Sequence, residues 1–186
     1  MTNHAVSGQS TSAQRRLFCP SWVLIPIART TRQRHGRSDE MKITTKSFRA
    51  TQPIPARFTA DGQNVNPPLA ISGVPSGTKS LALIVDDPDV PMGRWNHWLL
   101  WNIKPETKSI PENSVPRGAI VGHNDAGMAK YVGPSPPRGT HRYYFRLYAL
   151  DTKLDLPATA DRPILDDAIK GHVLAQAELL GRYARE

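Results

Sequence analysis

Three carboxylates and one histidine lie close together in the stretch IVDDPDVPMGRWNHWLLWNI, residues 84–103. Asp86, Asp87 and Asp89 follow an apolar run, and His97 comes just before the next apolar run begins. A carboxylate beside a histidine fixes the tautomer of the imidazole and raises its pKa, so that imidazolium becomes accessible near neutral pH. These residue types suit an anion site, an acid–base pair or a metal site, provided that the fold brings them together.

A second polar segment, GPSPPRGTHRYYFRLYALD, covers residues 133–151. Its prolines would pre-order the loop and lower the entropic cost of binding. With backbone N–H groups from this loop, His141 and the earlier histidine could hold a phosphate-sized anion. Three aromatic side chains could form an apolar rim around such a site, namely Trp95, Trp98 and Tyr143.

Strands are the elements that must position these residues. Residues 79–85 form a nearly continuous apolar run, which predicts a central strand covered on both faces. The aromatic and branched content of residues 97–103 and 141–150 also favours strands, and the second run alternates with a period of two. Proline and glycine recur between short runs of this kind, so we predict a mainly β fold, an antiparallel β-sandwich.

One helix is predicted near the C-terminus, with few other short helices. Asp161 and Pro163 are start signals for it. The apolar residues of this helix fall close to one face: Leu165, Ile169, Val173 and Leu180. His172 is then expected to pack near that face, whereas His123 is expected at the surface. Glycine-rich phosphate-binding loops are absent from the sequence, which disfavours nucleotide-binding folds.

The 186 residues fall into two parts that differ in their density of net charge. Residues 1–40 hold six Lys/Arg against two Asp/Glu, and residues 41–186 hold eighteen against fourteen, so each part contributes +4. The basic residues of the longer part are scattered, and we therefore expect no nucleic-acid partner. Cys19 is the single cysteine, which excludes an intrachain disulfide and a cysteine-based zinc cluster.

The first forty residues are expected to form a disordered or poorly packed extension before a domain at 41–186. Their apolar stretch, residues 17–28, is shorter than the roughly 20 residues of a membrane helix and contains two prolines. No small-residue cleavage site follows it. We therefore expect a protein that does not span the membrane and is cytoplasmic rather than periplasmic, with Met41 as an alternative start.

Three motifs, DDPDVP, HWLLWNI and GPSPPRGTHRYYFRLYALD, resemble in this order the phosphatidylethanolamine-binding protein family. The resemblance is closest to the bacterial Raf-kinase-inhibitor-like branch and spans about residues 41–186. It implies a β-sandwich with a small anion-accepting cavity near one end, and a cis peptide bond before Pro91. The ligand-binding positions that it implies are Asp87, Asp89, Pro91, His97, Ser135, Pro136, His141 and Tyr143. Relatives vary at the serine position, so its backbone is expected to matter more than its side chain.

The function implied by the resemblance is non-enzymatic binding of a small anion or a phosphorylated headgroup, without a cofactor. Regulation or inhibition of a kinase or protease partner would accompany it, and a homodimer is compatible with it. Two alternatives stay open. One is a hydrolase with Ser135 as nucleophile, His141 as base and Asp87 as orienting group, although the G-x-S-x-G elbow is absent. The other is a metal site built from Asp87, Asp89, His97 and His141, although no tight ligand spacing supports it.

Overall fold

The computed structural model describes residues 40–91 and 93–185 and has two antiparallel sheets. The small sheet has the order β1-β2-β5, comprising β1 (Lys42–Thr44), β2 (Leu69–Ser72) and β5 (Ser109–Ile110). The large sheet has the order β6-β4-β3-β7-β8, comprising β6 (Ile120–Val121), β4 (Trp95–Ile103), β3 (Ser80–Asp87), β7 (Thr140–Leu150) and β8 (Val173–Ala184). The helices are the 3-10 turn η1 (Ala56–Phe58) and α1 (Arg162–Ile169). The predicted β-sandwich is thereby confirmed.

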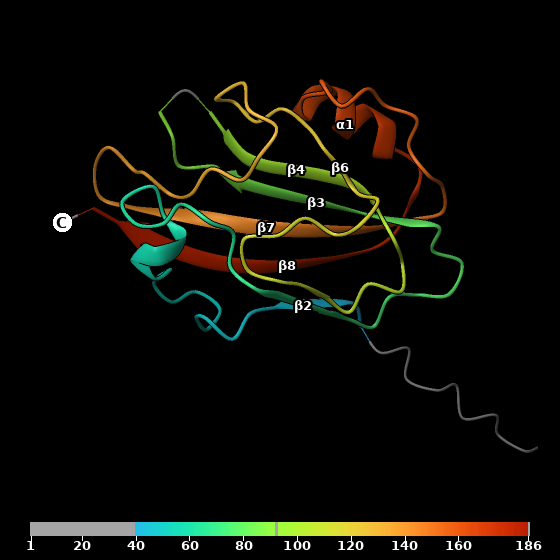
Figure 1. Cartoon of the computed structure of the whole chain (residues 1–186), viewed down its shortest axis with the longest axis horizontal. Coiled ribbons are helices and arrows are strands. Elements are labelled where there is room, and N and C mark those ends of the chain that lie inside the picture. Colours follow the sequence, from blue (N-terminus) through green and yellow to red (C-terminus); the bar gives the residue numbers. More distant parts are fainter. Residues whose placement is uncertain (1–39, 92, 186) are drawn as a thin grey trace, which may run out of the picture. The chain divides into compact units, whose positions relative to one another are not determined.

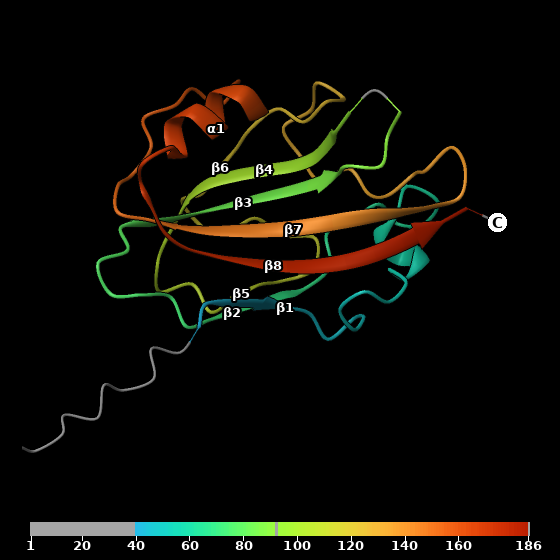
Figure 2. The same cartoon turned by 180° about the vertical axis from the view of Figure 1, so that it is seen from behind.

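The large sheet is the middle of three layers, with the small sheet on one face and α1 on the other (Figures 1 and 2). One hydrophobic cluster lies between the sheets, and a second lies between the large sheet and α1. Strand β3 is the middle strand of the large sheet, and both of its faces are covered. Every one of its residues is buried, with Leu83 in the first cluster and Ile84 in the second. Burying each such aliphatic side chain contributes about 1.5–3 kcal/mol.

Strand β7 shows the predicted alternation. Tyr143, Phe145 and Leu147 are buried in the core between the sheets, whereas the residues between them are half-buried on the opposite face. The same alternation in β3 separates its last two residues, so that Asp86 and Asp87 lie on opposite faces of the sheet. Only the second of these carboxylates lies on the face where the candidate site is found.

Helix α1 begins where the sequence predicts but is shorter than predicted. The Asp161 side chain caps its N-terminus by accepting a hydrogen bond from the backbone N–H of Ile164. The helix ends at Ile169, and Gly171, with φ 82°, turns the chain into β8. The prediction that the helix continues through Val173 and Leu180 is wrong, because pairing along β7 overrides the helix propensity of this segment.

The end of the helix also changes the expectation for His172. This residue follows α1 rather than lying on its apolar face, and its imidazole is about half exposed and 2.8 Å from a carboxylate oxygen of Asp151. The predicted packing role is therefore wrong. The prediction of a tail at residues 1–40 lies outside the described residues except for Glu40. Within the described part of the chain, no helix combines the length and the apolar character needed to cross a membrane.

Candidate functional site

A cavity of about 320 Å³ lies where three segments meet at one end of the large sheet. The end of β3 and the turn after it, the start of β4, and the loop before β7 all contribute to its wall. The lining residues are Asp87, Val90, Trp95, His97, Val132, Gly133, Ser135, Pro136, Pro137 and Tyr143. Five of the eight positions implied by the family resemblance therefore line one cavity, and they come from all three motifs.

His97 reaches the cavity because of a bulge in β4. Val85 pairs with Trp98 and Asp86 pairs with Asn96, so His97 is the extra residue between two successive pairs. Bulges of this kind redirect a side chain and are frequent beside functional sites. The bulge places the imidazole on the inner side of the sheet, against the ring of Tyr143 at a centroid distance of 5.3 Å.

The tautomer of His97 is set by its hydrogen bond. Its Nδ1 atom lies 2.7 Å from the carbonyl oxygen of Val132, which can only accept, so Nδ1 carries the proton. Burial lowers the pKa of His97 below its usual value, and the opposing effects of the Val132 carbonyl and the Asp87 carboxylate are smaller. The Asp87 carboxylate raises this pKa as expected, but the expectation that imidazolium becomes accessible near neutral pH is wrong for His97, since burial disfavours the charged imidazole more strongly. The neutral ring keeps a free lone pair on Nε2.

Asp87 is held by two donors. One carboxylate oxygen lies 2.7 Å from Nδ1 of His141, and the other accepts a hydrogen bond of 2.8 Å from the backbone N–H of Asp89. The carboxylate and the imidazole of this pair are both buried. His141 does not line the cavity. Its hydrogen bond holds the Asp87 carboxylate, which does.

Tyr143 brings a hydroxyl group without a partner to the cavity. The residue is 1 % exposed, and its oxygen has no hydrogen-bond partner within the described residues. Burial raises the pKa of this hydroxyl well above its usual value, and the Asp87 carboxylate acts in the same direction. The group is therefore a protonated donor. An unmade hydrogen bond of a buried polar group costs about 1–3 kcal/mol, which a ligand acceptor could recover.

The turn after β3 does not bring all of its residues to the cavity. Asp89 pairs with Arg142, whose backbone N–H and guanidinium both donate to the carboxylate and hold the pKa of Asp89 below its usual value. Pro91 is exposed, and its preceding peptide bond is trans, so the prediction of a cis bond is wrong. The hydrogen bond from Gly93 N–H to the Val90 carbonyl makes Pro91 the second residue of a turn, where trans proline is favoured.

Two of the predicted positions lie in the loop before β7. The side chain of Ser135 is exposed at the cavity, and Pro136 is buried in its wall. No hydrogen bond joins Ser135 to His141 in the described part of the chain. Within residues 40–91 and 93–185, no group of three His, Cys, Asp or Glu side chains is placed to hold a metal ion. The hydrolase and metal alternatives therefore gain no support.

Several residues that shape the cavity were not foreseen from the sequence. The Val132 carbonyl orients His97, and the side-chain oxygen of Asn64 accepts a 2.7 Å hydrogen bond from the backbone N–H of Gly133. A Cβ atom on Gly133 would lie 2.5 Å from the carbonyl oxygen of Phe58, so only glycine lets the two segments approach this closely. Trp98, predicted to form part of the rim, is instead buried in the core between the sheets.

A family model described as phosphatidylethanolamine-binding protein matches residues 44–184, which include all three motifs and every residue of the cavity. The chain belongs to this family. The phosphatidylethanolamine-binding protein fold is shared with a solved structure described as a putative homologue from Chlamydia trachomatis, at a TM-score of 0.76 and 39% identity, covering 79% of this chain and 99% of that one. A second structure, of Escherichia coli YbcL, has a TM-score of 0.75 and 30% identity over 79% of this chain and 99% of its own.

Two archaeal proteins are also similar to this chain in sequence. A Methanothermobacter thermautotrophicus protein named UPF0098 protein is 48% identical over 150 residues, which cover 78% of this chain and 99% of that protein. A UPF0098 protein of Pyrococcus horikoshii is 45% identical over 161 residues, with 81% of each chain covered. The prediction of a bacterial-type member of the phosphatidylethanolamine-binding protein family is confirmed.

Proposed function

We propose that this member of the phosphatidylethanolamine-binding protein family binds a small anionic group, such as the phosphate of a phosphorylated headgroup, in the cavity beside His97. The observation that carries the proposal is the buried hydroxyl of Tyr143, which lacks a hydrogen-bond partner within the described residues and lines the cavity. A charged acceptor bound there would satisfy this donor, and hydrogen bonds to charged groups contribute about 1.5–3 kcal/mol.

His97 and Tyr143 have complementary roles in this proposal. The neutral imidazole can accept a hydrogen bond at Nε2 from the P–OH group of a monoprotonated phosphate, while the tyrosine donates to an unprotonated oxygen. The buried Asp87 carboxylate accepts from Asp89 N–H and from His141, and it also lies near the Tyr143 hydroxyl, so a ligand oxygen would compete with it for the tyrosine proton. The arrangement suits a ligand that both donates and accepts hydrogen bonds.

The rim indicates what is attached to the anionic group. Trp95 is 39 % exposed and borders the cavity together with Val90, Pro136 and Pro137. These apolar side chains would contact a substituent that extends from the cavity toward solvent. A phosphorylated or acidic side chain of another protein would bring that protein onto this face, and we therefore include regulation of a kinase or protease partner as an extension of the proposal.

Calorimetric titration with inorganic phosphate at pH 6 to 7 tests the proposal. We expect saturable binding that Tyr143→Phe weakens about tenfold and that His97→Ala weakens further. Tyr148→Phe is the matched control, because Tyr148 lies on the opposite face of the same strand and should keep the wild-type affinity. The absence of phosphate binding by folded wild-type protein would contradict the proposal.

A further inference from the structure

The outer edge of β8 is covered by another segment over only part of its length. Near the C-terminus, the backbone N–H of Thr51 donates to the Leu180 carbonyl, and that of Ile54 donates to the Arg182 carbonyl, both at 2.7 Å. The N–H of Arg182 in turn donates to the Gln52 carbonyl at 3.1 Å. This part of the edge therefore accepts an extended segment, and the even-numbered residues of β8 direct their backbone groups toward it.

The other part of the same edge has no such cover. Pairing of β8 with β7 is regular from Ala175 to Ala184, so Gln176 and Glu178 also direct their backbone N–H and carbonyl groups outward. These groups have no backbone partner on the outer side within the described residues. An uncovered edge of this kind is a template for pairing with another strand.

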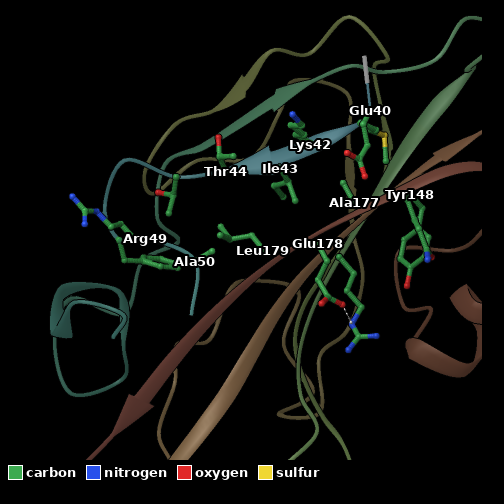
Figure 3. Close-up of a pocket in the computed structure, with 15 residues that line it drawn as sticks. Glu40, Lys42, Ile43, Thr44, Arg49, Ala50, Tyr148, Ala177, Glu178 and Leu179 are labelled. Atoms are coloured by element: carbon green, nitrogen blue, oxygen red, sulfur yellow. Dashed lines mark ion pairs between the residues drawn. The ribbon is translucent and has the colours of Figure 1, made fainter. Parts of the chain in front are cut away.

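A recess of about 710 Å³ lies in front of the uncovered edge (Figure 3). One wall is β8 from Gln176 to Leu179, and the opposite wall runs from Glu40 through β1 to Ala50. The side chains between the walls include Ile43 and Phe48, which belong to the core between the sheets. The recess therefore has an apolar floor between two sheet edges.

The border of the recess carries the guanidinium of Arg146. The Nε–H of Arg146 is buried and has no hydrogen-bond partner within the described residues. Its nearest carboxylate oxygens, on Asp86 and Glu178, lie 3.3 Å and 3.7 Å away. The guanidinium lies 4.5 Å from the centre of the Tyr144 ring, and Figure 3 shows its ion-pair partner Glu178 at the edge of the recess. The side chain of Arg146 is 24% exposed, so a further carboxylate could approach its outer part.

We propose that the recess binds an extended peptide segment of a partner protein, which adds a strand to β8 beside Gln176 and Glu178. Apolar side chains at alternate positions of the peptide would contact Ile43 and Phe48, and a carboxylate between them would pair with Arg146. The segment Thr51–Ile54 already pairs with the edge of β8 near the C-terminus. The peptide would pair with the neighbouring, uncovered part of the same edge. Because β1 forms the opposite wall, the recess is bounded on two sides, which favours a single extended strand over the sheet of a second folded copy.

The test uses the full chain and a fluorescein-labelled peptide of about seven residues in which valine and glutamate alternate, a length typical of one strand. Fluorescence anisotropy should show saturable binding that an excess of inorganic phosphate does not displace, because the recess is separate from the anion cavity. A peptide in which lysine replaces glutamate should bind at least about fivefold more weakly, a difference of about 1 kcal/mol. Arg146→Gln should remove most of that preference.

Gln176→Pro removes one outward N–H group while leaving the pairing with β7 intact, and it should lower the affinity at least about tenfold. Gln176→Val is the matched control that keeps this N–H group and should bind as the wild type does. Methylation of alternate backbone nitrogens of the peptide tests the same hydrogen bonds without altering the protein, and it should abolish binding. Binding that survives both changes would overturn the proposal. Sedimentation analysis could also overturn the proposal. If it showed a protein dimer that Gln176→Pro dissociates, a second copy of the chain would occupy the edge.

Discussion

Nδ1 of His141 lies 2.7 Å from a carboxylate oxygen of Asp87, although the two residues are 54 positions apart in the chain. The hydrogen bond links the second residue of β7 to the last residue of β3 and fixes the carboxylate that lines the cavity. His141 is therefore a positioning residue for the site, since the groups that border the cavity belong to Asp87, His97 and Tyr143.

Substitution of His141 should distinguish its hydrogen bond from its bulk. His141→Ala leaves the buried Asp87 carboxylate without its side-chain partner, and we expect a loss of about 3 kcal/mol in the free energy of unfolding. His141→Asn places an amide N–H near the position of Nδ1 and should recover at least half of that loss. Urea denaturation measures both. Equal losses for the two variants would show that the hydrogen bond is not what stabilises the site.

The pH dependence of stability should report on His97. Its pKa is lowered by burial in the folded protein, so the unfolded chain binds more protons between the lowered pKa and the usual value of about 6.5. The contribution of His97 to stability is therefore fully present above pH of about 6.5 and is lost as the pH falls through the folded pKa. The slope cannot exceed about 1.4 kcal/mol per pH unit for one proton.

The matched variant for this measurement is His97→Asn, which retains a donor for the Val132 carbonyl but does not titrate. Urea unfolding of both proteins between pH of about 7.5 and 5 should show the wild type losing stability relative to the variant. A constant difference across this range would mean that burial does not suppress protonation of His97.

Tyr143→Phe should separate ligand binding from folding. The hydroxyl has no partner within the described residues, so its removal should leave the free energy of unfolding unchanged or raise it by up to about 1 kcal/mol. Phosphate affinity should nevertheless fall about tenfold, as proposed above. Thermal unfolding with and without phosphate measures both effects, because a ligand that binds only the folded state stabilises it. If Tyr143→Phe were strongly destabilised without phosphate, the Tyr143 hydroxyl would have a hydrogen-bond partner in the free protein, which would contradict the structure.

Asp86 should be required for stability rather than for ligand binding. Its carboxylate is fully buried on the face opposite the cavity and lies 2.9 Å from Arg162 of α1 and 3.1 Å from Arg94. Asp86→Ala leaves the buried guanidinium of Arg162 without this carboxylate and should cost about 3–5 kcal/mol.

Asp166→Asn is the control for this prediction. Asp166 also pairs with Arg162, at 2.7 Å, but its side chain is 46% exposed, and its loss should cost less than about 1 kcal/mol. Chemical denaturation gives both values. Similar costs for the two substitutions would contradict the view that the buried pair with Asp86 anchors α1 to the sheet.

The features that depend on neighbouring residues can be predicted from the sequence alone. The apolar run at residues 79–85 specifies a central strand, the alternation in residues 141–150 specifies one buried face, and Asp161 marks the start of a helix. The three motifs are likewise local, which is why they indicate the family and most of the residues around the cavity. Each of these patterns is read from hydrophobicity or hydrogen-bonding capacity within a few positions along the chain.

The features that depend on distant partners could not be predicted from local sequence and follow from the tertiary structure. Residues 173–184 form a strand because β7 offers them a hydrogen-bonding edge, and His97 faces the cavity because a bulge displaces it from the register with β3. The pKa of His97 is lowered rather than raised because burial outweighs the nearby carboxylate, and burial is set by the packing of the whole domain. The uncovered part of the β8 edge arises for the same reason, since strand pairing and desolvation are determined by contacts between segments far apart in the chain.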